Sequence, residues 1–174
     1  MIPKVWSGCG KGDGLDFSFL STSVTVDLAA TDSGKEEASS GTSTLNLPST
    51  VVIEYVWGGT GIDFLYGNDS DNRLYGRSSG DSLDGRGGDD MMFGESGDDT
   101  VYGGVGTDTV YGDNPKNVSL TGNDYIHVDD LDDGDTVYCG PGQDTVVVDA
   151  RFDNNVLLEL DTHQDCETVN RRLP

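Results

Sequence analysis

A period of nine residues runs through the middle of the chain and constrains the fold more than any other feature. Reading from Gly58, most copies have glycine at the first place, and every copy has aspartate or asparagine at the sixth and an apolar residue at the eighth. Residues 58–66 and 103–111 are complete copies, and nine nearly consecutive copies end near residue 147. A seven-residue insertion at 115–121 stretches the register. A fixed short period of this kind is typical of a solenoid.

Each nonapeptide predicts half a coil. Glycine permits unusual backbone angles, so the first six places suit a turn, and the last three suit a short strand. Two repeats then complete one coil, and coils stack at the strand spacing of about 4.8 Å. The eighth places form two facing apolar columns: Leu65, Leu83, Val101 and Ile126 in one, and Leu74, Met92, Val110 and Val137 in the other. One apolar side chain per strand is a thin core, so burial alone drives folding weakly.

The same stacking aligns the sixth-place residues in two rows, one along each edge of the roll. The first row is Asp63, Asp81, Asp99, Asp124 and Asp144, and the second row is Asn72, Asp90, Asp108 and Asp135. Like charges about 5 Å apart repel by roughly 3 kcal/mol at an effective dielectric constant near 20. A divalent cation between successive carboxylates turns this repulsion into attraction, and turn carbonyls can complete the oxygen shell of calcium. Magnesium fits less well, because it demands a tighter octahedron.

About six calcium ions are therefore expected between successive acids. The pairs are Asp63/Asp81, Asp81/Asp99 and Asp99/Asp124 in the first row, and Asn72/Asp90, Asp90/Asp108 and Asp108/Asp135 in the second. Asn72 weakens its position because a neutral amide replaces a carboxylate, and the insertion puts Asp99/Asp124 in question.

Composition agrees with cation binding and disfavours other partners. The chain of 174 residues has a net charge of −22, and 26 of its 32 acidic residues are aspartate. Such a charge repels phosphate, so nucleic acid and anionic membranes are poor partners. No apolar run approaches the roughly 18 residues of a membrane span. Residues 1–20 do not show the basic and apolar segments of a secretory signal.

The repeat resembles the hemolysin-type calcium-binding repeats of the RTX (repeats-in-toxin) proteins over about residues 58–149. The resemblance implies an all-β fold, a parallel β-roll that forms a two-sheet right-handed β-solenoid with non-repeating β caps at both ends. We expect an N-terminal flank at 1–57, the roll at 58–149 and a C-terminal cap at 150–174. In the flank, 24–28 and 53–56 look like strands, and 34–50 looks like a mobile loop between strands.

The resemblance also implies a role. It indicates a calcium-binding module of a secreted, extracellular protein, which folds when the ions bind and is not itself an enzyme. Turn carbonyls would assist the acids, among them those of Gly59, Gly61, Gly104 and Gly106 in the two complete copies. A neighbouring domain of a parent protein or a polysaccharide is a possible partner.

Other interpretations of single features stay open. Aromatic residues share the ninth place at Tyr75, Phe93, Tyr111 and Tyr138, and such a row could bind sugars or simply cover a thin core. A flat sheet face with threonines at the seventh place could bind ice. Residues 76–80 match the hydrolase pattern Gly-x-Ser-x-Gly, but repeats flank them where a helix should follow. His127 is an isolated histidine, for which a zinc or general-base role is the weaker interpretation.

The three cysteines leave one pairing open. Cys139 and Cys166 could form a disulfide that staples the C-terminal cap, as in an oxidising environment. Cys9 is then unpaired or cross-links two copies of the chain.

Overall fold

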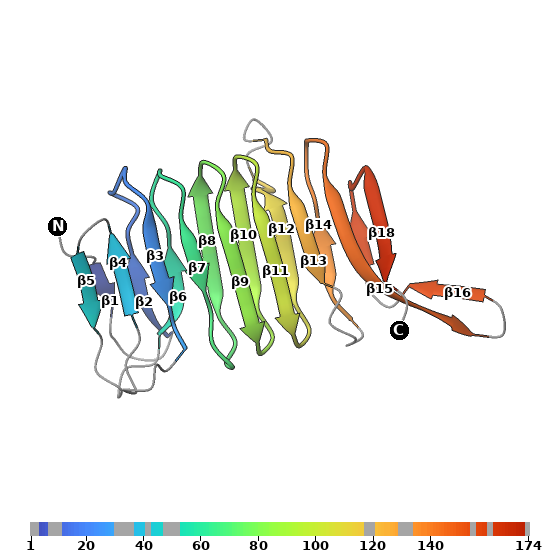
Figure 1. Cartoon of the computed structure of the whole chain (residues 1–174), viewed down its shortest axis with the longest axis horizontal. Coiled ribbons are helices and arrows are strands. Elements are labelled where there is room, and N and C mark those ends of the chain that lie inside the picture. The colour runs from blue at the N-terminus through green and yellow to red at the C-terminus, as the bar shows by residue number, and fades with distance from the viewer. Residues whose placement is uncertain are drawn as a thin grey trace.

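The computed structural model is an all-β molecule extended along one axis (Figure 1). The structure describes the backbone of residues 4–6, 12–29, 37–40, 43–46, 53–116, 121–128, 134–153, 156–159 and 162–172. Side-chain environments are described for 12–29, 53–116, 121–128, 134–148 and 164–172. Every regular element in these residues is a strand.

Two sheets contain the strands. The first sheet has the order β1 (Lys4–Trp6), β2 (Asp13–Asp16), β6 (Ile53–Trp57), β8 (Arg73–Ser78), β10 (Met91–Ser96), β12 (Thr109–Asp113), β14 (Thr136–Tyr138) and β17 (Thr162–Gln164). The second has the order β16 (Val156–Glu159), β15 (Thr145–Asp153), β13 (Tyr125–Val128), β11 (Thr100–Val105), β9 (Ser82–Gly87), β7 (Phe64–Tyr66), β3 (Val24–Asp27), β4 (Glu37–Ser40) and β5 (Ser43–Asn46), with β18 (Thr168–Arg172) paired to β15.

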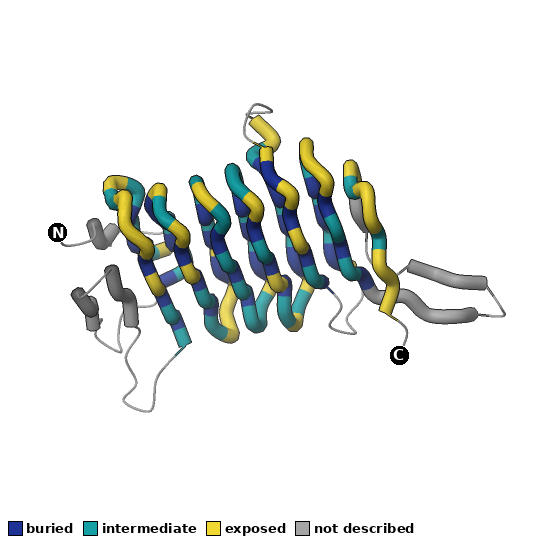
Figure 2. The backbone as a smooth tube through the Cα atoms, turned by 45° about the horizontal axis from the view of Figure 1, so that its top comes forward, coloured by how far each residue is buried: buried dark blue, intermediate teal, exposed yellow. Residues whose placement is uncertain are grey.

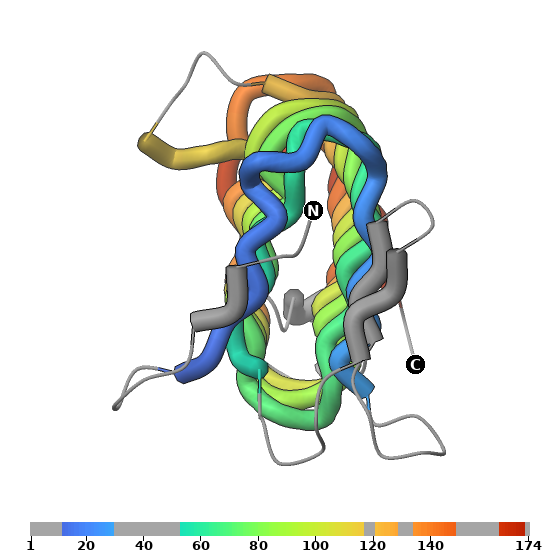
Figure 3. Tube along the Cα trace, turned by 90° about the vertical axis from the view of Figure 1, so that its left-hand side faces the viewer, coloured from blue at the N-terminus to red at the C-terminus, as the bar shows by residue number. Residues whose placement is uncertain are grey.

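The chain alternates between the sheets, so that each coil contributes one strand to each. In the second sheet Leu65 is opposite Leu83, and Leu83 is opposite Val101, a spacing of two repeats. These pairs are parallel, and the view along the long axis shows two walls joined by turns at both edges (Figure 3). The predicted parallel β-roll is confirmed.

The core is the pair of apolar columns that the repeat predicted. All eight predicted column residues are fully buried, and buried and exposed positions alternate along the strands (Figure 2). The columns continue beyond the regular repeats, through Leu15 and Val56 in the first sheet and Val26 and Val146 in the second. Flanking strands thus add to the same narrow core.

The strands are longer than the three-residue strands that the repeat suggested. β8, β9, β10 and β11 each contain six residues, because they run on through the first three places of the next repeat. Those places also pair between coils, as Glu95 does with Arg77 and Gly104 with Arg86. Turns of equal length stack in register, so their backbone groups can continue the hydrogen bonds between strands. The turn between two strands then consists of places four to six of each repeat.

The segment at 34–50 contains structure where we expected a loop. Strands β4 and β5 form an antiparallel hairpin that pairs with β3. An open strand edge exposes unpaired backbone groups, and the hairpin supplies partners for those of β3. The prediction of a loop was wrong, since serine and threonine are compatible with strands as well as with turns.

At the other end, Cys139 and Cys166 form a disulfide with their Cα atoms 5.2 Å apart. Cys139 is fully buried at the end of the apolar core, and Cys166 packs against the same core. The bond ties the segment before β18 to the turn after β14. Cys9 lies outside the described residues.

Candidate metal centre

The first row of sixth-place residues forms a hydrogen-bonded ladder, here called the first ladder: Asp63, Asp81, Asp99, Asp124 and Asp144. The backbone N–H of Asp63 donates to Oδ1 of Asp81 at 2.7 Å, and that of Asp81 donates to Oδ1 of Asp99 at 2.7 Å. The N–H of Asp124 donates to Oδ1 of Asp144 at 2.8 Å. One oxygen of each carboxylate thus locks its coil to the preceding one.

The insertion does not break this ladder. The N–H of Asp99 donates to Oδ1 of Asp124 at 3.0 Å, although the two residues are 25 positions apart. The N–H of Tyr125 also donates to the carbonyl of Asp99 at 2.8 Å. The register therefore closes across the insertion, of which residues 117–120 lie outside the described part.

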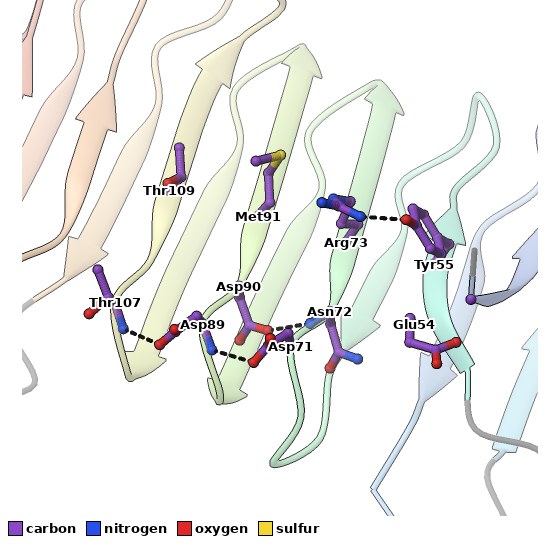
Figure 4. A pocket seen from close by; sticks show the side chains of 11 residues that line it. Glu54, Tyr55, Asp71, Asn72, Arg73, Asp89, Asp90, Met91, Thr107 and Thr109 are labelled. Carbon is purple, nitrogen blue, oxygen red and sulfur yellow. Dashed lines mark hydrogen bonds between the residues drawn. The ribbon is translucent and has the colours of Figure 1, made fainter. Parts of the chain in front are cut away.

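The opposite edge carries the second ladder, formed by Asn72, Asp90, Asp108 and Asp135. The N–H of Asn72 donates to Oδ1 of Asp90 at 2.7 Å, and that of Asp90 to Oδ1 of Asp108 at 2.9 Å. Figure 4 shows this edge, with Asp90 reaching Asn72 on the preceding coil. A second, exposed row runs beside it, in which Asp89 donates its N–H to Asp71 at 3.0 Å.

The second oxygen of several carboxylates has no donor. Oδ2 is buried and without a hydrogen-bond partner at five ladder positions: Asp81, Asp90, Asp99, Asp124 and Asp144. These side chains are at most 3 % exposed. A buried carboxylate oxygen without a donor is costly, so such a group pairs with a positive charge, coordinates a metal ion or takes up a proton. The ladders therefore present oxygens that suit a hard metal ion.

Burial shifts the acid–base equilibrium of these groups. It raises the pKa of Asp81 to about 8 and that of Asp90 to about 8, because the charged form loses its water. Burial, followed by the charges of Asp124 and Asp81, raises the pKa of Asp99 to about 9. Without a counter-ion, the ladders resist holding their full negative charge at neutral pH.

Glycine at the first place makes room for the carboxylate of the same repeat. A Cβ atom added to Gly76 would lie 2.6 Å from Oδ2 of Asp81, and one added to Gly94 would lie 2.4 Å from Oδ2 of Asp99. The same added atom on Gly94 would lie 2.6 Å from the carbonyl oxygen of Gly112. This close packing explains why glycine recurs at that place.

Two glutamates extend the ladders at positions that sequence reasoning missed. Oε2 of Glu54 accepts the N–H of Asp13 at 2.6 Å, and Oε2 of Glu167 accepts that of Asp144 at 2.7 Å. Glu54 lies in β6 and Glu167 directly precedes β18, and each is two residues before a valine, Val56 or Val169, that packs in or against the core. An acid two places before a column residue was the available signal, but neither segment has the glycines that mark a repeat.

The acids alone do not enclose an ion. Among the residues with described side chains, no three acidic, histidine or cysteine side chains converge as a metal site. An ion between two coils would therefore need backbone carbonyls beside one or two carboxylates. Calcium accepts such mixed oxygen shells of six to eight ligands.

Two features with a possible catalytic interpretation lie in ordinary strand positions. Ser78 ends β8, and the chain continues into β9, without the helix that a nucleophile elbow requires. His127 stacks on Tyr102 with ring centroids 5.0 Å apart.

The fold and the edges together define a β-roll in which each regular turn contributes a buried aspartate or asparagine. Comparison with known families agrees: residues 57–92 and 84–114 match the RTX calcium-binding nonapeptide repeat (4 copies). Residues 57–114 therefore carry RTX repeats, and such repeats imply a calcium-binding β-roll module. No curated protein matches the chain significantly. The described part of the chain contains no helix suited to crossing a bilayer.

Proposed function

We propose that this chain is a calcium-folded structural module of a secreted protein, and that its ladders hold a series of ions between the coils. The observation that carries the proposal is the set of buried carboxylate oxygens without donors, four in the first ladder and one, that of Asp90, in the second. Each of these Oδ2 atoms is free to coordinate a cation between two coils. The Oδ1 atom of the same carboxylate accepts a hydrogen bond from the neighbouring coil. The proposed role is mechanical rather than catalytic.

The two ladders have seven positions between successive members, four in the first and three in the second, and the proposed ions fill about six of them. The ligands are the carboxylates of Asp63, Asp81, Asp99, Asp124, Asp90, Asp108 and Asp135, with the amide of Asn72 and with Asp144 at the end of the first ladder. Turn carbonyls, including those of Gly59, Gly61, Gly104 and Gly106, complete the shell. We propose the same three parts as before: a flank at 1–57, the roll at 58–149 and a cap at 150–174.

Charge supports this assignment. Residues 58–149 contain 20 acidic and 4 basic residues, a net charge of −16. Six divalent ions would reduce that charge to about −4, which removes most of the repulsion between coils. Each site filled at ten times its dissociation constant contributes roughly 1.4 kcal/mol. Because the core is narrow, several such sites can decide whether the roll folds.

The environment of such a module follows from its chemistry. Extracellular calcium modules bind with dissociation constants of about 10⁻⁴ to 10⁻³ M, so they fill outside the cell. A disulfide between Cys139 and Cys166 is also stable in an oxidising environment. Export followed by calcium-driven folding is consistent with both features.

The aromatic row gives little support to the sugar-binding alternative. Tyr75, Phe93 and Tyr111 stack on one another with centroids 4.8 Å apart and planes within 2° of parallel. Trp57 and Tyr138 extend this row at its two ends. Sugars stack on exposed ring faces, whereas here the faces cover each other and leave mainly edges. The row is better suited to covering this face of the sheet above the thin core.

Counting bound ions tests the proposal. Isothermal titration of the chelator-treated chain with calcium should give about six ions per chain. Equilibrium dialysis with metal analysis should give the same number. A count below three, or binding of magnesium as tight as that of calcium, would refute the proposed ladder sites.

A further inference from the structure

Asp113 is a buried acid that the nonapeptide pattern does not require. It occupies the second place of the interrupted repeat, where preceding coils of the same sheet have Arg77 and Glu95. Those two are partly exposed, but Asp113 is only 3 % exposed. Gly140 follows in the next coil, and a Cβ atom there would lie 2.7 Å from Cβ of Asp113. Asp113 thus fills space that the absence of a side chain at Gly140 leaves open.

The carboxylate of Asp113 has no geometric hydrogen-bond partner for either oxygen. Its backbone N–H donates to the carbonyl of Cys139 at 3.1 Å, which holds this residue against the disulfide-bonded turn. The N–H of Gly122 lies near enough to favour the charged carboxylate, although it makes no proper hydrogen bond. An unpartnered carboxylate, almost fully buried, is therefore aimed into the C-terminal coils.

Two ladder acids share this region. Burial, then the charge of Asp144, raises the pKa of Asp113 to about 7. Burial, then the charges of Asp113 and Asp144, raises the pKa of Asp124 to about 7. Asp124 and Asp144 each keep a buried Oδ2 without a donor. Three acids that repel one another, each with an unsatisfied oxygen, thus lie along one stretch of the first edge.

We propose that Asp113 is an additional calcium ligand at the position between Asp124 and Asp144, which makes this the tightest calcium site of the roll. This inference rests on the proposed calcium-binding function. Three carboxylates hold a cation more strongly than two, and ligand charge is a main determinant of calcium affinity in proteins. The three side chains do not converge in the structure, so this inference requires Asp113 to turn toward the ion when it binds.

The disulfide gives this site a further advantage. Cys139 fixes the turn that carries Gly140, and Cys166 precedes Glu167, whose Oε2 accepts the N–H of Asp144 at 2.7 Å. The surroundings of the site are therefore held in place more firmly than those of the regular turns. Because fewer groups must be ordered when the ion binds, the entropy cost of binding is smaller and the calcium affinity is higher. The site is expected to fill first and to order the C-terminal coils.

The test compares calcium affinities of full-length variants by competition with a chromophoric chelator. The wild-type chain should show one step at least about tenfold tighter than the others. D113N and D113G should both lose that step; the second variant places at position 113 the glycine found at the second place of other copies. E95Q is the matched control, because Glu95 is an acid in the same column one coil earlier.

The outcomes separate this inference from the proposed function. If E95Q keeps the tight step and both Asp113 variants lose it while retaining the weaker sites, the inference holds. If both Asp113 variants bind like wild type, Asp113 is a buried acid without a metal role and the inference is overturned. If the wild-type chain binds no calcium, the proposed function itself fails.

Discussion

At the scale of single residues, a ladder aspartate whose Oδ2 lacks a donor has two distinct tasks. In Asp99, Oδ1 accepts the N–H of Asp81 at 2.7 Å, whereas Oδ2 has no donor. The first contact needs only an acceptor, which the oxygen of an amide also provides. The second oxygen needs a cation. Replacing the acid by its amide therefore separates the two tasks.

For D99N we expect opposite effects with and without calcium. In saturating calcium the variant should bind up to two fewer ions and lose roughly 1–3 kcal/mol of unfolding free energy, because Asp99 serves two proposed positions. In EGTA, an osmolyte can be added so that a measurable fraction of the chain folds. There the variant should fold more readily than the wild type, since a buried ionisable carboxyl has been replaced by a neutral amide.

Urea denaturation followed by circular dichroism measures both effects. D98N is the control, because Asp98 is an exposed neighbour of Asp99. A loss of stability of equal size in both solutions would contradict this division of tasks.

The close fit of the first-place glycines gives a second test. G94A places a Cβ atom 2.4 Å from Oδ2 of Asp99, so we expect it to lose about 2 kcal/mol or more in calcium. G87A is the matched control, because its nearest neighbour is Oδ1 of Asp69 at 3.6 Å, an ordinary contact. The control should change stability by less than about 0.5 kcal/mol. Thermal denaturation of both variants provides the comparison, and equal losses would argue against the packing explanation.

At the scale of elements, the sequence specified the repeating part well. The period of nine placed Leu83 and Val101 opposite each other and Asp81 beside Asp99, because identical turns must stack in register. It did not identify Glu54 or Glu167 as ladder ends, since their segments lack the turn glycines. It also missed the buried position of Asp113, which depends on the glycine one coil later.

The strands of the N-terminal flank were partly predictable. Val24, Val26 and Leu28 alternate as a half-buried strand should, and all three are buried. The hairpin of β4 and β5 was not foreseen, because its composition does not distinguish strand from loop. Its pairing with β3 depends on an open sheet edge, which only the folded roll reveals.

The C-terminal elements depend on one covalent bond. The disulfide closes a sequence separation of 27 residues, so the double variant C139S/C166S should lose about 3 kcal/mol of stability in calcium. The loss should be concentrated near β17 and β18, which the bond ties to the roll. Hydrogen exchange read by mass spectrometry locates it. Unchanged protection of these two strands would contradict the proposed role of the bond.

At the scale of the whole molecule, the buried acids predict an unusual response to pH. Burial raises the pKa of Asp81, Asp90 and Asp99 to about 8, 8 and 9, from an ordinary value of 3.8. A raised pKa favours the folded state below the ordinary value, and this advantage is lost as pH rises through the folded one. Without calcium, the roll should therefore be more folded near pH 4 than near pH 8.

Calcium should reverse this dependence, because it binds the ionised carboxylates and competes with protons. Circular dichroism across this pH range, in EGTA and in calcium, tests the reversal. A calcium-free chain that gains structure as pH rises would contradict the assignment of the ladders as the dominant buried charges.

The most direct test of the whole account is a calcium titration of the full chain followed by far-ultraviolet circular dichroism. We predict little β-structure in EGTA, a cooperative gain of β-signal as calcium is added, and its loss when the chelator is returned in excess. A spectrum already rich in β-structure in EGTA, and unchanged by calcium, would contradict the claim that the ions hold this thin roll together.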